Sequence, residues 1–101
     1  MALDLRMVYD NALDQMTFYV NRVDALGAQL TDEYEGQPLN VGVNSRRRLS
    51  CKYSLTDNSP VGVVARSYRE VWGDDPKYFS AVLAIFFGVP PATILDLLPK
   101  F

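Results

Sequence analysis

The segment SRRRLSCK carries four cations within seven residues of an otherwise acidic chain: Arg46, Arg47, Arg48 and Lys52. Guanidinium groups bind phosphate and carboxylate through paired, charge-assisted hydrogen bonds. The cluster therefore predicts a contact with an anion or with an acidic protein surface. The structural alternative is a solvated hairpin tip whose charges keep a sheet edge from pairing with other strands. An acidic patch could neutralise the cluster within one chain or across a dimer, and it comprises Asp32, Glu33 and Glu35.

The segment LAIFFGVPPATILDL, residues 83–97, has the spacing of a helix-turn-helix. Ala84 would allow a second helix to cross closely, and Gly88 would allow the positive φ of the turn. Val89 and Ile94 follow at the distances at which side chains fill the core between two such helices. The spacing predicts two helices that meet at a corner.

The second helix of this corner lacks the side chains that read DNA. A DNA-binding helix presents Arg, Lys, Asn, Gln or Ser to the base edges. The early and outward positions here are Pro90, Pro91, Ala92, Leu95 and Asp96, and the one cation nearby is Lys100. The net charge is −2, whereas nucleic-acid-binding domains are usually basic. We therefore expect a structural corner, with Leu95 and Phe101 facing a protein partner.

The residue types that common enzymatic chemistry needs are scarce. The chain has no histidine, so it lacks the commonest general base and the commonest zinc ligand. Cys51 is the single cysteine, with no histidine to activate it and no partner for an intrachain disulfide. No Walker or Rossmann glycine pattern occurs. These features predict a protein that is not an enzyme and that uses no metal or cofactor.

The apolar pattern of the first quarter predicts a long helix. Apolar side chains recur in steps of three and four over residues 5–26, which is the spacing of one helix face. Asp4 would cap this helix and Gly27 would end it. Phe18 lies outside the apolar stripe, where it would cover the rim of the core or contact a partner. The contact area of such a helix predicts a homodimer or a larger homo-oligomer.

The middle of the chain alternates apolar and polar residues, as strands with one buried face do. Residues 39–43 and 49–55 follow this pattern with the arginines between them, and they predict a small β-hairpin. Cys51 would be a core residue of its second strand.

Helices are expected over most of the remaining chain, at residues 60–72, 76–87 and 91–98. The first begins with Ser59 as a cap and Pro60 in the first turn, which favours a helix. Its β-branched start, residues 60–64, could instead extend the sheet.

The stretch CKYSLTDNSPVGVVARSYREVWG, followed by FFGVPPATILDL, resembles small mycobacteriophage and actinobacterial proteins of about this length. Those proteins share a Cys-x-Tyr strand, a helix that starts at a proline and a Gly-Val helix corner. Matching residues here are Cys51, Tyr53, Pro60, Gly88 and Val89, whereas a second cysteine that often precedes the helix is replaced by Ser59 or Pro60. The resemblance covers about half of the chain and brings no activity with it. It implies only a bacterial or phage setting.

Together these patterns predict one α+β domain over residues 1–101 that is mainly helical. It would contain a long N-terminal helix, a small β-hairpin and three C-terminal helices with a helix-turn-helix-like corner. No apolar run reaches the ~18–20 residues of a membrane span, and a lone cysteine suits a reducing compartment, so we expect a cytoplasmic protein.

The leading functional hypothesis is a non-enzymatic interaction protein that acts through self-association or through a host partner protein. The alternative is a small DNA-binding regulator whose basic hairpin contacts phosphate, with weak binding to nucleic acid.

Overall fold

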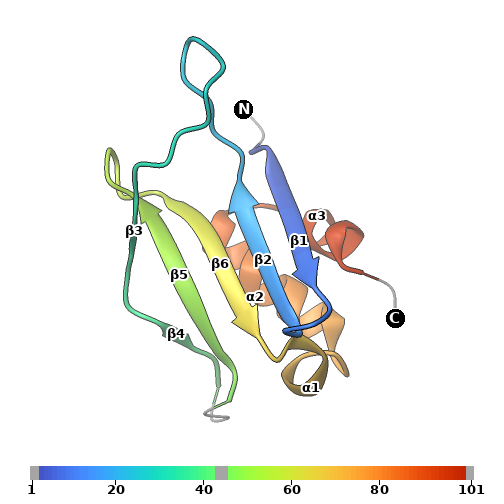
Figure 1. Cartoon of the computed structure of the whole chain (residues 1–101). Coiled ribbons are helices and arrows are strands. Elements are labelled where there is room, and N and C mark those ends of the chain that lie inside the picture. Colours follow the sequence, from blue (N-terminus) through green and yellow to red (C-terminus); the bar gives the residue numbers. More distant parts are fainter. Residues whose placement is uncertain (1–2, 43–45, 100–101) are drawn as a thin grey trace.

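The computed structural model describes residues 3–42 and 46–99, and its main element is a sheet rather than a helix (Figure 1). The strands are β1 (Leu5–Asp10), β2 (Gln15–Val20), β3 (Glu33–Glu35), β4 (Leu39–Asn40), β5 (Arg48–Ser54) and β6 (Pro60–Arg66). They form a six-stranded antiparallel sheet in the order β1-β2-β6-β5-β3, and β4 also pairs with β5. Three short helices follow, α1 (Tyr68–Val71), α2 (Pro76–Phe87) and α3 (Pro91–Leu97).

The expectation of a long N-terminal helix is wrong, because residues 5–20 form the β1–β2 hairpin. Alternate side chains face the helices: Leu5, Met7 and Tyr9 on β1, and Met16, Phe18 and Val20 on β2. The Asp10 carboxylate accepts the backbone N–H groups of Ala12 and Leu13 and so stabilises the turn between the strands. The segment contains apolar residues at steps of three and four and also at a period of two, and pairing of β2 with β6 favours the strands.

The expected helix over residues 60–72 is also wrong, because residues 60–66 form the central strand β6. This strand lies between β2 and β5, and Val61, Val63 and Ala65 are buried. β-branched residues suit such a position, and Pro60 is tolerated as the first residue of the strand. Only Tyr68–Val71, the end of the predicted segment, is helical.

The last two helices are confirmed, whereas the predicted small hairpin is only part of the larger sheet, with residues 39–40 as its first strand. Leu39 pairs with Leu49, and Cys51 is a core residue with 1% of its surface exposed. Val43 of the predicted first strand lies outside the described residues. The Asp75 carboxylate caps α2 by accepting the N–H of Tyr78, and Gly88 ends that helix with φ 70°.

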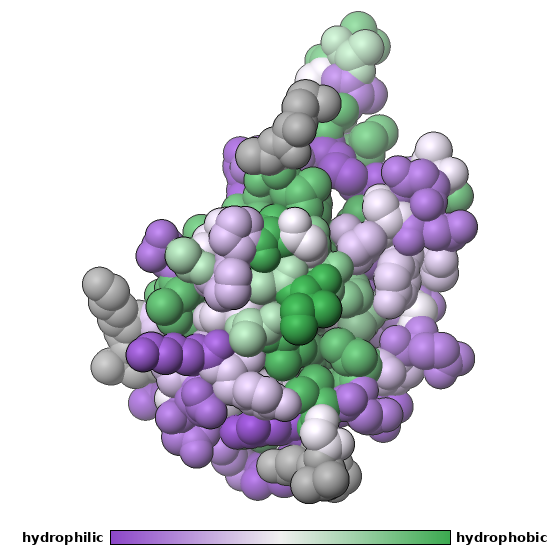
Figure 2. Space-filling view, turned by 180° about the vertical axis from the view of Figure 1, so that it is seen from behind, coloured by the Kyte–Doolittle hydropathy of each residue, from purple (hydrophilic) through white to green (hydrophobic). Residues whose placement is uncertain are grey.

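The three helices cover one face of the sheet, and among residues 3–42 and 46–99 no helix lies over the opposite face (Figure 1). The core between the layers contains Trp72, Phe79 and Leu83, each fully buried. Figure 2 shows the outer side of the helical layer, where hydrophobic side chains gather over its centre. Although α2 is apolar nearly all round, it is not fully buried, because Ile85 is 85% exposed. None of the described helices is long and apolar enough to cross a membrane.

Candidate anion-binding site

A shallow pocket of about 530 Å³ lies where β5 begins and β6 ends. Leu49, Cys51 and Ala65 face the core, so the residues that alternate with them face the uncovered side of the sheet. The polar side chains that line the pocket are Arg48 and Ser50 from β5, Arg66 from β6, Arg46, Ser67 and Glu35. Pro38 and Val71 complete its wall.

Arg48 and Arg66 form the centre of this site. Ser50 pairs with Val64 and Leu49 with Ala65, so the next pair along the ladder sets Arg48 opposite Arg66. Arg66 Nη1 donates to Ser50 Oγ at 3.1 Å. Neither guanidinium has an ion-pair partner among the described residues. Like charges directly opposite each other destabilise a sheet, so this arrangement costs stability unless an anion lies between them.

Arg46 brings a third guanidinium to the pocket, and two carboxylates lie close by. Its Nη2 is 2.5 Å from Glu70 Oε1, and both side chains are more than half exposed. Glu35 lines the pocket itself. An exposed ion pair of this kind contributes little to stability, so a ligand could displace Glu70 at small cost.

Arg47 points away from the pocket, although it lies between two of its residues in sequence. Its guanidinium carbon lies 5.2 Å from the ring centroids of Trp72 and of Tyr78. Arg47 Nη2 is 3.8 Å from Asp74 Oδ1, and the side chain is 22% exposed. The predicted hairpin tip is therefore not solvated throughout, because Arg47 attaches it to the helical layer.

Lys52 also lies apart from the pocket. Its Nζ is 3.7 Å from Glu33 Oε1, and it lines a separate hollow over Gly62. Of the predicted acidic patch, Glu33 thus neutralises a cation within the chain and Glu35 faces the pocket. The structure brings Arg46 and Arg48 together and separates them from Arg47 and Lys52.

A strained residue, Ser67, forms the wall of the pocket at the start of α1. Its backbone is left-handed, with φ 56° and ψ 46°, which costs about 1 kcal/mol or more for a residue with a side chain. Two contacts from the next residues to the β1–β2 turn hold it there. The N–H of Tyr68 donates to Asp14 O at 3.0 Å, and the N–H of Arg69 donates to both carboxylate oxygens of Asp14 at 3.1 Å.

The three predicted interface residues have different positions. Phe18 is completely buried and contacts Phe79, so it is a core residue and not a surface for a partner. Leu95 is 39% exposed on α3. Phe101 lies outside the described residues.

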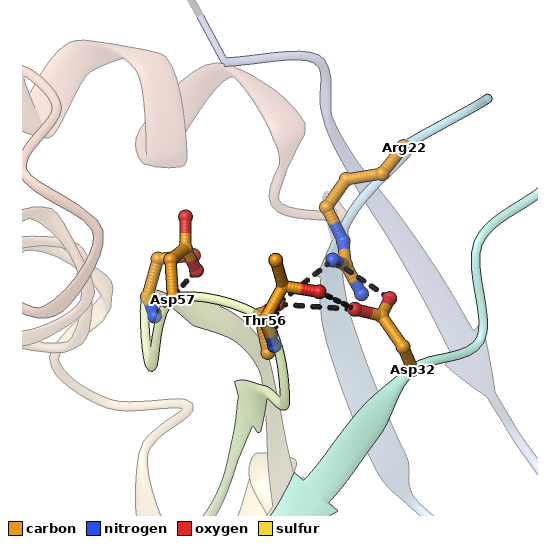
Figure 3. Close-up of polar contacts among 6 residues, drawn as sticks. Arg22, Asp32, Thr56 and Asp57 are labelled. Atoms are coloured by element: carbon orange, nitrogen blue, oxygen red, sulfur yellow. Dashed lines mark hydrogen bonds and ion pairs between the residues drawn. The ribbon is translucent and has the colours of Figure 1, made fainter. Parts of the chain in front are cut away.

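A second polar cluster, shown in Figure 3, lies where β2 and β5 end and β3 begins, at the end of the sheet away from the pocket. Arg22 Nη1 is 3.1 Å from Asp32 Oδ1, and the Thr56 hydroxyl donates to Asp32 Oδ2 at 2.5 Å. The Thr56 hydrogen bond is the main cause that lowers the pKa of Asp32, which therefore stays ionised and is a weak base. The Arg22–Asp32 pair joins the two ends of the extended loop between β2 and β3, which is a structural role.

Cys51 has the chemistry of a core residue. Burial raises the pKa of its thiol, so the thiolate that would act as a nucleophile is disfavoured. Within residues 3–42 and 46–99, no group of three or more acidic or cysteine side chains could hold a metal ion. The chemistry that the site offers is binding of an anion by guanidinium and hydroxyl groups.

The sequence patterns do not identify Arg66, Ser50 or Ser67 as site residues. The incorrect prediction of a helix over residues 60–72 does not place Arg66 on a strand, next to the strand that contains Arg48. The alternation of Val61, Val63 and Ala65 with residues 62, 64 and 66 is the signal that could have placed Arg66 on the uncovered face. Its position opposite Arg48 depends on strand register, which no local pattern encodes.

Comparisons of the chain with protein-family models, with curated proteins and with solved structures find no match.

Proposed function

We propose that this chain is a non-catalytic interaction module that binds a short acidic segment of a partner protein in the arginine pocket. The observation that carries the proposal is the pair Arg48 and Arg66, opposite each other on adjacent strands without an ion-pair partner in the described structure. A carboxylate between them would replace a repulsion with two charge-assisted pairs. Ser50 and Ser67 add hydroxyl groups that can orient the ligand.

The charge around the pocket favours a short ligand over an extended polyanion. Glu35 lines the pocket and Glu70 is ion-paired to Arg46 beside it. The whole chain has a net charge of −2. A long phosphate backbone would meet these negative charges on leaving the pocket, whereas two or three carboxylates would fit between the arginines.

A DNA-binding regulator is the second candidate, and the helix corner favours it. Gly88 has the left-handed backbone of such a turn, and Ile94 fills the core between α2 and α3. The exposed positions of α3, however, are Pro91, Ala92, Thr93, Leu95 and Asp96. Only Thr93 among these offers a hydrogen-bond donor to a base, so this candidate would rely on phosphate contacts at the arginine pocket.

Titration of a fluorescein-labelled acidic hexapeptide of aspartate and glutamate, followed by anisotropy, tests the proposal. We expect saturable binding that weakens as salt rises. Arg48→Gln and Arg66→Gln should each weaken it about tenfold or more, because a hydrogen bond to a charged group contributes about 1.5–3 kcal/mol. Lys77→Gln removes one exposed cation from α2 and is the matched control, with unchanged binding expected.

Equal losses with Arg48→Gln and Lys77→Gln would contradict the proposal, because binding would then depend on net charge alone. A duplex DNA of about 20 base pairs serves as the competing ligand. Tighter binding of this duplex than of the peptide at 0.15 M salt, where screening is short-ranged, would favour the regulator instead.

A further inference from the structure

β1 is an edge strand, because β2 is its only neighbour in the strand order of the described residues (Figure 1). Proteins usually protect such edges with a proline, a bulge or a lysine, since an exposed edge pairs readily with another chain. The sequence of β1, LRMVYD, contains no proline or lysine, and its register with β2 has no bulge. It has instead two charges of opposite sign, Arg6 and Asp10, and an apolar side chain midway between them, Val8, which is 55% exposed.

The hydrogen-bond pattern of the β1–β2 ladder shows which backbone groups face the open edge. The N–H of Asn21 donates to Asp4 O at 2.8 Å, and this contact continues the pairing of Leu5 with Val20. Hydrogen-bonded and non-hydrogen-bonded pairs alternate along an antiparallel ladder. Arg6 and Val8 therefore direct their backbone groups to β2, and Met7 directs its N–H and C=O outward.

We propose that β1 pairs antiparallel with β1 of a second copy of this chain, with Val8 opposite the partner's Val8. In this register Arg6 lies opposite the partner's Asp10, and Asp10 lies opposite the partner's Arg6. These are non-hydrogen-bonded positions of the new ladder, where Cα atoms are about 4.5 Å apart and side chains are closest. The two-fold symmetry thus forms two opposite-charge pairs around one apolar contact.

Other registers lose this complementarity. A shift of two residues is the smallest that keeps the backbone groups in phase. Such shifts place Arg6 opposite the partner's Val8 or the partner's Ala12, and the opposite-charge pairs disappear. A further shift places Arg6 opposite the partner's Arg6, which is repulsive. The charge pattern of β1 therefore selects one register.

The proposed register also accounts for exposed apolar side chains at the two ends of the strand. Leu3 is 42% exposed just before β1, and Leu13 is 66% exposed in the turn after it. Continuing the pairing brings Leu3 toward the turn that holds the partner's Leu13. Burial of apolar surface at both ends and at Val8 would stabilise the dimer.

The contacts that Arg6 and Asp10 make within the chain leave both side chains available to pair with the partner. Arg6 Nη2 is 3.2 Å from Asp4 Oδ2, in a pair exposed by more than half on both sides. Such a pair contributes little, so exchange for the partner's Asp10 is cheap. Asp10 uses Oδ1 to accept the N–H groups of Ala12 and Leu13, which leaves Oδ2 for the guanidinium.

The test is the molar mass in solution, measured by size exclusion with light scattering, and the dissociation constant from sedimentation equilibrium. We expect twice the 11.4 kDa of one chain. Arg6→Glu should weaken the dimer at least tenfold, because both symmetric pairs become repulsive. Arg6→Gln should also weaken the dimer, and adding Asp10→Asn to it should cause no further loss, because either change alone already removes both opposite-charge pairs. The amide oxygen of Asn can still accept the N–H groups of the turn.

Val8→Lys should also dissociate the dimer and leave the pairing of β1 with β2 unchanged. Two other exposed apolar side chains provide matched controls, Ile85→Lys on α2 and Leu26→Lys in the loop before β3. Both should remain dimeric. Circular dichroism of each variant verifies that it is folded.

A monomeric wild-type chain at about 200 μM, or dissociation by Ile85→Lys rather than by Val8→Lys, would overturn the proposal. The interface does not include the arginine pocket, so its failure leaves the proposed function standing.

Discussion

The three consecutive arginines have different surroundings because successive side chains of a strand point to opposite faces of the sheet. β5 begins at Arg48, and the alternation of a strand sends Arg48 to the uncovered face of the sheet. Arg47, one residue earlier, faces the helical layer and lies against Trp72 and Tyr78. A uniformly solvated tip would tolerate the loss of any of the three. This tip has one arginine that supports the fold and two that line a pocket.

Alanine substitution distinguishes the structural role of Arg47 from the pocket-lining role of Arg48. Arg47→Ala should lower the free energy of unfolding by about 1–2 kcal/mol, because it removes contacts with two aromatic rings and the packing of the aliphatic stem. Arg48→Ala should change it by less than about 0.5 kcal/mol, because the loss relieves the repulsion with Arg66. Urea unfolding monitored by Trp72 fluorescence measures both. Equal effects would show that Arg47 does not anchor the hairpin.

At the scale of elements, the C-terminal half is predictable because its signals are local. Asp75 accepts the N–H of Tyr78 three residues later, and Gly88 ends α2 with its own backbone conformation. Each signal acts within one helical turn, so the neighbouring sequence suffices to identify it. The helix over residues 76–87 and the corner after it are accordingly confirmed.

The N-terminal half is not predictable in the same way, because its secondary structure depends on distant pairing. Residues 5–26 fit the spacing of a helix, yet Leu5, Met7 and Tyr9 also alternate as a strand does. β2 pairs with β6, whose first residue is forty positions after the last of β2. Such non-local contacts decide between two patterns that the local sequence satisfies equally. Phe18 favours the strand, because a large aromatic side chain outside the helical stripe fits the core face of a strand.

Gly88→Ala tests the corner between α2 and α3. Gly88 has φ 70°, and a Cβ built there has no atom within 4 Å, so the penalty comes from the backbone conformation alone. We expect a loss of about 1 kcal/mol, seen as a melting temperature lower by about 4–8 °C. Gly88→Asn is the control, because asparagine tolerates the left-handed region and should lose less. An unchanged melting temperature for Gly88→Ala would contradict this description of the corner.

For the molecule as a whole, the sequence identifies only some of the residues that form the site. Arg46 and Arg48 lie two residues apart in the chain, and their charge identifies them. Arg66 lies opposite Arg48 only because β5 and β6 pair in one register. Ser67 joins the pocket because Asp14, in the turn between β1 and β2, holds the start of α1 in place. A composite site of this kind requires the fold before it can be identified.

Asp14 also makes the stability of the whole molecule depend on pH, because it joins the sheet to the helical layer. Burial acts to raise the pKa of its carboxyl, but the hydrogen bonds from the Tyr9 hydroxyl and from the N–H of Arg69 lower it by more. A carboxyl whose pKa is lowered by folding stabilises the protein above its unfolded value, 3.8, and this stabilisation is lost as the pH falls through the folded value.

Asp14→Asn should therefore destabilise the protein at pH 7 and have a smaller effect in acid. The expected loss at pH 7 is about 1.5–3 kcal/mol, because hydrogen bonds to a charged acceptor are replaced by hydrogen bonds to a neutral one. Below about pH 3 the wild-type carboxyl becomes protonated too, so the difference between the two proteins should shrink. Urea unfolding at pH 7 and below pH 3 measures the difference in the free energy of unfolding.

Asp96→Asn makes the same chemical change at an exposed position of α3 and is the matched control. A difference for Asp14→Asn that stays constant from pH 7 to pH 2 would show that the amide disturbs packing and that the charge of Asp14 does not hold the two layers together.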